Sequence, residues 1–333
     1  MEKLVVTLKT VTPLFLGGAE PNESAELRAP SIKGAMRFWY RTMKGNLPID
    51  ELNKKEAELF GGMGQGQGQS KVQIIVNDRL KPKNGKLPEH KIDVSGKSFK
   101  INIIEYLGYG LYDTRNHSLI RQYIPDKEEF TIVIKWKTGT TPQDICDIKK
   151  TLLLLCAFGG LGSRNRNGFG CLNVKGKIDD IENCDEKEIL KVCKTIELAD
   201  FTAFSKESKL FKMEETYYTW DEALASIGKA YKAARESIEK KHTYDLRQCI
   251  ASPIIVSEKG ASVQKSSLGR HAKPYFMHVK TVKVNNEDKY EGRILFLPYK
   301  YCDKTKLTDY NAATTSLNNS LLRNGFVEVK LYE

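Results

Sequence analysis

The sequence predicts an α+β fold built from two halves of similar construction. Runs in which apolar and polar residues alternate, such as residues 4–11 and 130–137, predict strands, and longer segments with apolar residues at helical spacing predict helices. One short sequence recurs: residues 166–169 and 323–326 both read RNGF, each time after an apolar helix and before a strand. Because the context matches as well as the residues, we infer a duplication. The halves fit two tandem ferredoxin-like domains with long loop insertions.

The first half supplies the strands and helices expected of one such domain. Alternation predicts strands at residues 71–76, 99–107 and 171–177 in addition to the two named above. A helix is expected over residues 30–44, with Ser31 as its N-cap. A second helix is expected to begin with Thr141 as N-cap and Pro142 as its first residue, to run through apolar residues to 157, and to end at Gly159.

The second half begins after an acidic segment. Residues 179–188 hold six carboxylates, which indicates a linker over residues 179–194 between a first domain, 1–178, and a second, 195–333. Strands are expected at residues 195–204, 248–256, 275–284, 293–297 and 326–331. Thr219 and Glu222 form a capping-box pattern that opens a helix over 221–240. Leu224, Ile227 and Tyr231 mark its buried side, and residues 308–322 predict a last helix.

Composition and charge limit the kinds of partner. The formal charge is +11, from 53 basic and 42 acidic residues, which favours a polyanion such as RNA, DNA or an anionic membrane surface. No apolar run approaches the ~20 residues needed to span a bilayer, and the N-terminus is unlike a signal peptide, so we expect a cytoplasmic protein. The seven cysteines form no paired metal spacing, and we expect buried free thiols with no zinc, disulfide framework or other cofactor.

The predicted helix at residues 30–44 carries one apolar stripe and one cationic stripe. The cationic stripe consists of Lys33, Arg37, Arg41 and Lys44, and no acidic residue occurs between Leu27 and Asn46. Such a stripe is often a solvated face, but the lack of compensating carboxylates favours contact with nucleic acid. Gly34, expected in the first turn, would let a phosphate approach the N–H groups at the helix N-terminus.

A glycine-rich loop, FGGLGSRNRNGFG, follows the apolar helix at residues 158–170. Its glycines permit positive φ and close approach, and consecutive N–H groups in such turns bind anions. Arginine adds a planar fork that matches phosphate geometry. The loop matches neither nucleotide-binding glycine motif, because it follows a helix where both of those motifs precede one. The sequence therefore favours a cradle for a polyanion backbone, and the alternative is a helix stop followed by a solvated basic loop.

Three other segments leave alternatives open. Glu20, Glu23 and Glu26 could hold a hard metal ion or form a solvated loop. Residues 61–69, GGMGQGQGQ, could close over a bound strand or form a plain hairpin tip. Tyr109 and Tyr112, near Arg115 and His117, suit base stacking and packing at a domain edge equally well.

The motifs together resemble a known family. TPLFLGG at residues 12–18, ELRAPSIKGAMRFW at 26–39 and the glycine-rich loop resemble the RAMP superfamily of CRISPR proteins, and more closely subunit one of the type III-B (Cmr) effector complex. Residues 251–253 and 292–298 extend the resemblance into the second half, so it covers most of the chain. It implies two tandem RAMP domains of ferredoxin-like (RRM-like) fold.

The resemblance also implies a function. It implies a noncatalytic subunit that holds the 3′ region of CRISPR RNA and nearby target RNA among other Cmr protein subunits. The RNA-contacting elements of the family map onto Lys33, Arg37 and Arg41 and onto residues 159–170, the same positions that the charge pattern selects. The second RNGF copy lacks the preceding glycine cluster, so a second phosphate cradle is not expected there.

The first hypothesis is a module that binds an RNA backbone without cleaving it. Phosphate contacts are expected from arginine and lysine side chains and from N–H groups of the loop. The candidate RNA-binding residues are Lys33, Arg37, Arg41, Lys44, Gly160, Gly162, Ser163, Arg164, Asn165 and Arg166.

Two alternative functions remain. A metal-independent RAMP endoribonuclease that processes CRISPR RNA would need a general acid and a general base, and the candidates are His117, His271, Lys273 and Tyr275, with the segment from His271 to His278 the densest local cluster. A structural assembly subunit would use its basic faces to meet acidic protein partners, with an exposed apolar patch beside the first helix.

Overall fold

The computed structural model describes residues 2–329 except 19, 21–23, 65–67, 78–79, 95–97, 114, 176–189, 191–193, 241–242, 259–260 and 302–303. Glu23 of the acidic loop, the centre of the 61–69 loop and most of the predicted linker, 179–194, lie outside the described residues.

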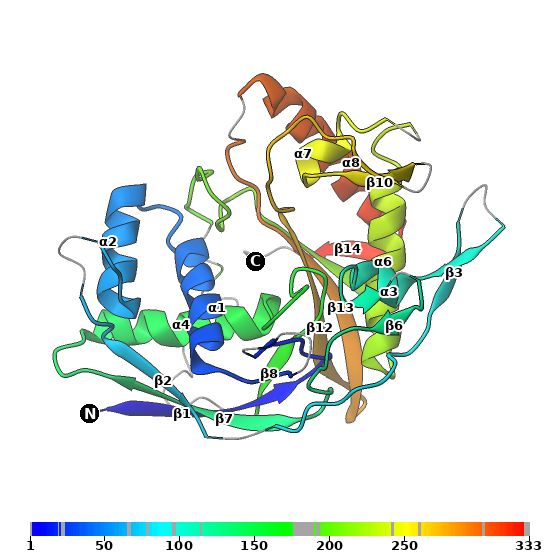
Figure 1. Ribbon diagram of the computed structural model, residues 1–333. Helices are drawn as coiled ribbons and strands as arrows, with labels where there is room; N and C mark the ends of the chain where they lie inside the picture. Colours follow the sequence, from blue (N-terminus) through cyan, green and yellow to red (C-terminus); the bar gives the residue numbers. More distant parts are fainter. Residues whose placement is uncertain are drawn as a thin grey trace.

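The first sheet has four antiparallel strands in the order β2-β7-β1-β8. These are β1 (Lys3–Thr10), β2 (Val72–Val76), β7 (Glu129–Trp136) and β8 (Leu172–Lys175). Buried residues alternate along β1 and β7, so one face of the sheet is apolar. Helices α1 (Ala29–Met43) and α4 (Pro142–Phe158) pack beside this sheet (Figure 1). Numbered within the half, the strand order is 2-3-1-4, that of a ferredoxin-like domain.

The second sheet repeats this arrangement. Its strands, in the order β12-β13-β9-β14, are β9 (Lys209–Tyr217), β12 (Tyr275–Val284), β13 (Glu287–Phe296) and β14 (Phe326–Val329). Helices α6 (Trp220–Glu236) and α8 (Leu307–Arg323) accompany it (Figure 1). The repeated tetrapeptide has a common geometry, because Gly168 and Gly325 have φ of +86° and +84°. The predicted α+β fold of two ferredoxin-like halves is therefore confirmed.

The remaining elements lie in insertions and connections. They are α2 (Ile49–Phe60), β3 (Lys91–Asp93), β4 (Lys100–Asn102), α3 (Ile103–Leu107), β5 (Tyr112–Asp113), β6 (Ser118–Leu119), α7 (Arg247–Ile250), β10 (Ile255–Glu258), β11 (Ala261–Gln264) and a 3₁₀ turn, η1 (Lys304–Lys306). None of the helices in the described part of the chain is long and apolar enough to cross a membrane.

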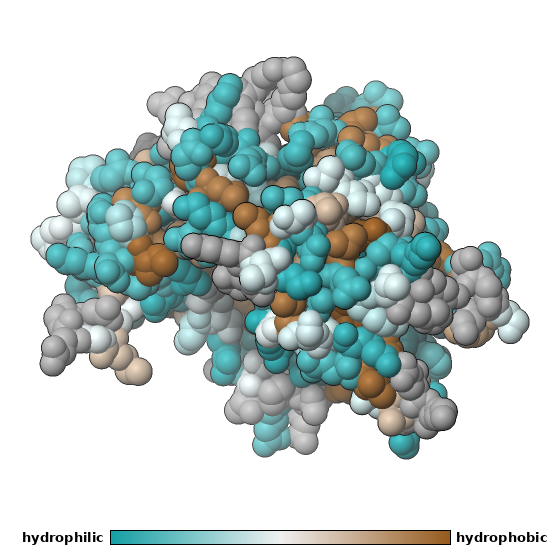
Figure 2. Space-filling model, turned by 90° about the horizontal axis from the view of Figure 1, so that it is seen from above, coloured by the Kyte–Doolittle hydropathy of each residue, from teal (hydrophilic) through white to brown (hydrophobic). Residues whose placement is uncertain are grey.

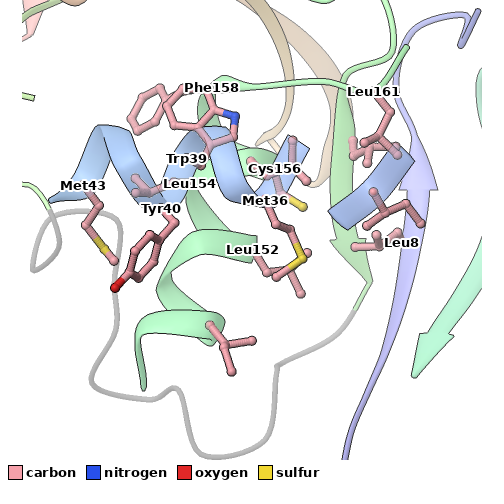
Figure 3. Packing of buried hydrophobic residues seen from close by; sticks show 14 of the residues in the cluster. Leu8, Met36, Trp39, Tyr40, Met43, Leu152, Leu154, Cys156, Phe158 and Leu161 are labelled. Carbon is pink, nitrogen blue, oxygen red and sulfur yellow. The ribbon is translucent and has the colours of Figure 1, made fainter. Parts of the chain in front are cut away.

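The core of the first half reaches into the second. Trp39 on α1 packs against Phe158 at the end of α4, with ring centroids 6.3 Å apart (Figure 3). The same indole lies 5.7 Å from the ring of Phe276 on β12. At the junction, the N–H of Met277 donates to the carbonyl of Arg166 at 3.1 Å. Buried aromatic contacts of this kind fix how the two halves meet.

Several predicted elements are wrong. The strand expected at 99–107 is the short β4 followed by α3, because the Asn102 side chain accepts from the N–H of Ile104 and caps a helix. Residues 195–204 form no strand, and the first strand of the second sheet lies later in the chain. Residues 248–256 hold most of α7 and the start of β10. Helix α2 was not predicted.

Candidate nucleic-acid interface

Helix α1 begins earlier than predicted, and its start offers little to an anion. Its N-cap is Arg28, and the N–H of Ser31 already donates to the Arg28 carbonyl at 3.0 Å, so Ser31 is not the cap. Pro30 has no N–H to offer. Gly34 consequently lies in the second turn, where the backbone N–H is an intrahelical donor. The predicted phosphate contact with N–H groups at Gly34 is therefore wrong. The residue is nevertheless exposed, and beyond its chain neighbours and the backbone of its own helix no atom lies within 4 Å of the place a Cβ would occupy.

The arginines of α1 are paired with a carboxylate, which corrects the prediction of an uncompensated cationic stripe. Glu56, on α2 and 4% exposed, accepts from Arg37 Nε at 2.5 Å and from Arg41 Nη1 at 2.7 Å. Arg37 also donates to the carbonyl of Gly61 at 3.1 Å. One carboxylate serves two guanidinium groups, so this cluster keeps one net positive charge, and both arginine side chains remain more than a third exposed.

The lysines of α1 also have partners. Lys44 Nζ lies 2.7 Å from the buried carboxylate of Asp147 on α4. Lys33 Nζ donates to Ser70 Oγ at 2.7 Å and to the carbonyl of Val72 at 3.2 Å. Burial lowers the pKa of Lys33, and the charge of Arg37 lowers it further. These lysines hold α1 against β2 and α4.

The glycine-rich loop is a compact turn that uses left-handed backbone. Gly162 and Gly170 have φ of +83° and +69°, where a side chain is strained, and a Cβ at Gly162 would collide with the carbonyl of Phe15. The N–H of Leu161 donates to Gly170 and that of Ser163 to Phe15, at 2.9 and 2.8 Å.

Only one amide of the predicted cradle is both accessible and without an acceptor among the described residues. The N–H groups of Gly160 and Gly162 donate to no other residue in the described part of the chain. Because Gly160 is buried, the cradle expected from the N–H groups of the loop is reduced to the amide of Gly162.

The loop side chains divide between anchoring and exposure. Arg166 lies between two rings, 5.4 Å from the centroid of Phe38 on α1 and 4.5 Å from that of Phe276 on β12. Its Nη1 donates to the Lys273 carbonyl at 2.8 Å, and burial lowers its pKa. Asn165 Nδ2 donates to the carbonyl of Gly160 at 3.1 Å and braces the turn.

Arg164 is exposed and adopts φ of +61°. Its guanidinium carbon lies 5.9 Å from the ring centroid of Tyr109. Beside it, Arg121 Nη1 donates to Ser163 Oγ at 3.1 Å. Arg121 lowers the pKa of Arg164 in addition to the larger effect of burial, so the two positive charges lie close together.

A cavity of 450 Å³ brings α1, the glycine-rich loop and the second half together, and we call it the groove. It is lined by Leu16, Ser31, Gly34, Ala35, Phe38, Trp39, Gly159, Gly162, Asn165, Arg166 and Phe276. Figure 2 looks down on the side that is uppermost in Figure 1 and shows apolar residues in the middle of that surface, among hydrophilic ones. Three of the predicted RNA-binding residues line the groove: Gly162, Asn165 and Arg166. The other seven do not, namely Lys33, Arg37, Arg41, Lys44, Gly160, Ser163 and Arg164.

The sequence pattern did not single out three residues of this region. Phe38 and Phe276 line the groove and flank Arg166, and Arg121 adds a cation beside Ser163. The sequence shows Phe38 only as one of three consecutive aromatic residues, which does not indicate a contact with the loop. Arg121 lies 37 residues before the loop and Phe276 lies 106 residues after it, so only the fold places them there.

The candidate acid and base residues do not form one site. His117 Nδ1 lies 2.8 Å from Glu105 Oε1, in an insertion of the first half. His271 Nε2 lies 3.3 Å from the Cys249 carbonyl, against Tyr301. Tyr275 is fully buried and donates to Asn318 Oδ1 at 2.9 Å.

His278, at the end of the histidine segment, is also inaccessible, at 1% exposure. Its Nδ1 lies 2.9 Å from the Gly159 carbonyl and must carry the hydrogen, because the carbonyl can only accept. Burial lowers the pKa of His278 to about 3, so the ring is neutral and links β12 to the start of the loop. Across the described residues, no three histidine, cysteine, aspartate or glutamate side chains are grouped to hold a metal ion.

Comparison with known proteins places this geometry in a family. Two curated relatives from Pyrococcus furiosus are the CRISPR system Cmr subunits Cmr1-1 and Cmr1-2. The first is 29% identical over 172 residues, covering 50% of this chain and 46% of the relative, and the second is 24% identical over 189 residues, covering 53% and 96%. The chain thus matches about half the length of the first relative. The similarity to the first Cmr subunit predicted from the sequence is confirmed.

Solved structures show the same fold over nearly the whole chain. The apo crystal structure of Cmr1 from Pyrococcus furiosus superposes with a TM-score of 0.59 at 18% identity, covering 100% of this chain and 99% of that one. A chain of the type III-B Cmr-β complex bound to cognate target RNA gives 0.54 at 14% identity, covering 95% and 100%. The family model described as RAMP superfamily matches residues 7–173, half of the sequence. The chain therefore belongs to the RAMP superfamily.

Proposed function

We propose that this chain is a noncatalytic RNA-binding subunit of a type III-B CRISPR (Cmr) complex. It would hold the 3′ region of CRISPR RNA, the paired target RNA, or both, beside other Cmr subunits. The observation that carries the proposal is the groove, in which the side-chain-free surface of Gly34 faces the same cavity as Gly162 and Arg166. Support from relatives is indirect: one similar chain belongs to a complex bound to target RNA.

The chemistry of the groove suits a backbone better than a base sequence. Two glycines let a chain approach closely, and Arg166 supplies charge from a position fixed by two rings. Arg164 and Arg121 extend the positive charge along the outside of the loop. Since phosphate contacts position a strand without reading it, sequence reading falls to pairing between guide and target.

The cations of α1 act more weakly than the sequence pattern suggested. Arg37 and Arg41 share Glu56, so a phosphate must compete with a buried carboxylate for both. Their exposed edges contribute long-range field to an RNA lying in the groove. We assign the direct phosphate contacts to the glycine-rich loop and the long-range electrostatic attraction of RNA to the arginines of α1.

A noncatalytic role agrees with the placement of the titratable side chains. Cleavage of RNA without a metal needs an acid and a base at one phosphate. His117, His271 and Tyr275 have separate surroundings, and the fourth candidate, Lys273, lies over the ring of Tyr231. None of the four lines the groove. The endoribonuclease alternative therefore has no assembled site in the described residues.

The test measures binding of single-stranded RNA by the full chain over a range of salt concentrations. For single strands, log K falls with log salt by about 0.7 for each phosphate contacted. Replacing Arg164 and Arg166 together by glutamine should lower this slope by about 1.4. Lys229→Gln, which removes one charge from an exposed position on α6, is the matched control and should leave the slope nearly unchanged.

Two results would contradict the proposal. A slope unchanged in the double variant would remove these arginines from the interface. Discrete cleavage products on a denaturing gel, persisting in the presence of chelator, would replace the binding function by the endoribonuclease.

A further inference from the structure

Four cationic side chains converge where the two halves meet. Arg164 and Arg166 come from the glycine-rich loop, Arg235 from the end of α6, and Lys273 from the segment before β12. The carbonyl of Lys273 accepts from Arg166 Nη1 at 2.8 Å, which ties two of them directly. Burial lowers the pKa of Lys273 well below its usual range, and the charges of Arg235, Arg166 and Arg164 lower it further, so all four lie within electrostatic range.

Aromatic rings, and not carboxylates, accompany these cations. Lys273 Nζ lies 4.6 Å from the ring centroid of Tyr231, and Arg235 Nη1 lies 3.4 Å from the hydroxyl of Tyr106. Within the described part of the chain, no carboxylate forms an ion pair with any of the four cations.

The nearby acidic side chains are already paired. Glu236, beside Arg235, binds Lys232 at 2.6 Å, and Glu239 binds Arg247 at 2.9 Å. Burial lowers the pKa of Arg235, but Tyr106, Tyr231 and Glu236 raise it by more, so this arginine stays charged. Burial and the three arginines instead disfavour the protonated form of Lys273, which a bound anion would restore. The cluster therefore calls for an anionic ligand.

The adjoining surface has room and a stacking face for such a ligand. A cavity of 560 Å³ is lined by Val94, Tyr109, Arg235, Glu236, Tyr244, Arg247 and residues 253–256, and its one carboxylate, Glu236, is the partner of Lys232. Tyr109 also lines a neighbouring cavity of 640 Å³, and 66% of its surface is exposed. An exposed tyrosine beside an uncompensated arginine is the arrangement that binds a nucleotide by stacking its base and pairing its phosphate.

We propose that Arg164, Arg235 and Lys273 bind a phosphate at the junction of the two halves, and that Tyr109 stacks the adjacent base. The RNA thereby leaves the groove past Arg166 and reaches the C-terminal end of α6 at Arg235. This inference rests on the proposed RNA-binding function and extends it from the groove to the surface around Tyr109 and Arg235.

Base stacking and phosphate pairing have different effects on RNA affinity and on its salt dependence, and two single variants distinguish them. Tyr109→Ala should weaken binding of a single-stranded oligouridylate of about fifteen nucleotides by about 5- to 150-fold, the effect of losing one base–aromatic stack, with the salt slope unchanged. Arg235→Gln should lower the slope by about 0.7, the contribution of one phosphate. Tyr218→Ala, another exposed tyrosine, and Lys229→Gln on the same helix as Arg235 are the controls, and both should bind like the parent.

The outcomes distinguish this inference from the function on which it rests. If the parent protein binds the oligouridylate and both Tyr109→Ala and Arg235→Gln match it in affinity and slope, the junction site is wrong and the groove remains. If the parent protein binds no RNA at any salt concentration, the proposed function fails and the junction site fails with it. Thermal unfolding of each variant, expected to match the parent for Tyr109→Ala, excludes a folding defect.

Discussion

Replacing Gly34 by alanine is expected to stabilise the protein and to weaken RNA binding. Glycine inside a helix costs about 1 kcal/mol relative to alanine. At Gly34 nothing within 4 Å of the new Cβ opposes the change, so we expect a gain of about 0.5–1 kcal/mol in the free energy of unfolding. Because no packing contact explains a glycine at position 34, we attribute it to the close approach of RNA in the groove.

The loss in binding follows from the length of the added bond. A Cβ stands about 1.5 Å from its Cα and would hold an approaching phosphate back by a similar distance. Moving that phosphate from about 4 to about 5.5 Å from a cation weakens the attraction by about 1 kcal/mol at an effective dielectric constant of about 20. The dissociation constant for single-stranded RNA should therefore rise about fivefold. Gly34→Gln, with a longer side chain, should bind more weakly still.

Gly228 on α6 is the matched control. A Cβ there would lie 2.8 Å from both Ile103 and Leu107, so this glycine allows α3 to pack. Gly228→Ala should lower the free energy of unfolding by about 1–3 kcal/mol. Chemical denaturation measures both stabilities, and fluorescence anisotropy with labelled RNA measures binding. If Gly34→Ala is more stable and binds RNA as tightly as the parent, the assignment of this face to RNA is refuted.

Two further predictions concern buried charge. His278 binds a proton below about pH 6.5 in the unfolded chain but only below about pH 3 in the folded chain, so the free energy of unfolding should fall as the pH drops through this range. Chemical denaturation of the parent should show a decrease of about 2 kcal/mol between pH 7 and pH 5 that His278→Asn lacks. Equal decreases in the parent and the variant would contradict this prediction. Glu56→Gln should destabilise the fold by about 1–3 kcal/mol, because Arg37 and Arg41 lose a charged partner. It should also tighten RNA binding at low salt by a few-fold, because the carboxylate no longer competes with phosphate for these arginines. Weaker RNA binding by the folded variant would show that these arginines do not attract RNA.

Local patterns predicted the elements whose signals lie within a few residues. The alternation of β1 and β7, the Thr141 cap of α4 and the capping box at Thr219 are all confirmed. Prediction failed where a local signal was ambiguous. Residues 99–107 are apolar enough for a strand, but Asn102 caps a helix inside them.

The candidate site shows the same division. The positions of Gly34 and of the glycine-rich loop were predicted from composition and spacing, and both line the groove. The prediction of an unpaired cationic stripe was wrong, because Glu56 comes from α2 and Asp147 from α4. The sequence of α1 alone gives no indication of either carboxylate.

The sequence by itself determined the two-half α+β fold, most strands of the two sheets, helices α1, α4, α6 and α8, and the place of the glycine-rich loop, since periodicity, caps and glycines act over a few neighbouring residues. Tertiary structure decided which charges remain uncompensated. It paired Arg37 and Arg41 with a distant carboxylate and left Arg164 and Lys273 among aromatic rings. Electrostatic interactions depend on distance through space, and only the folded chain sets that distance.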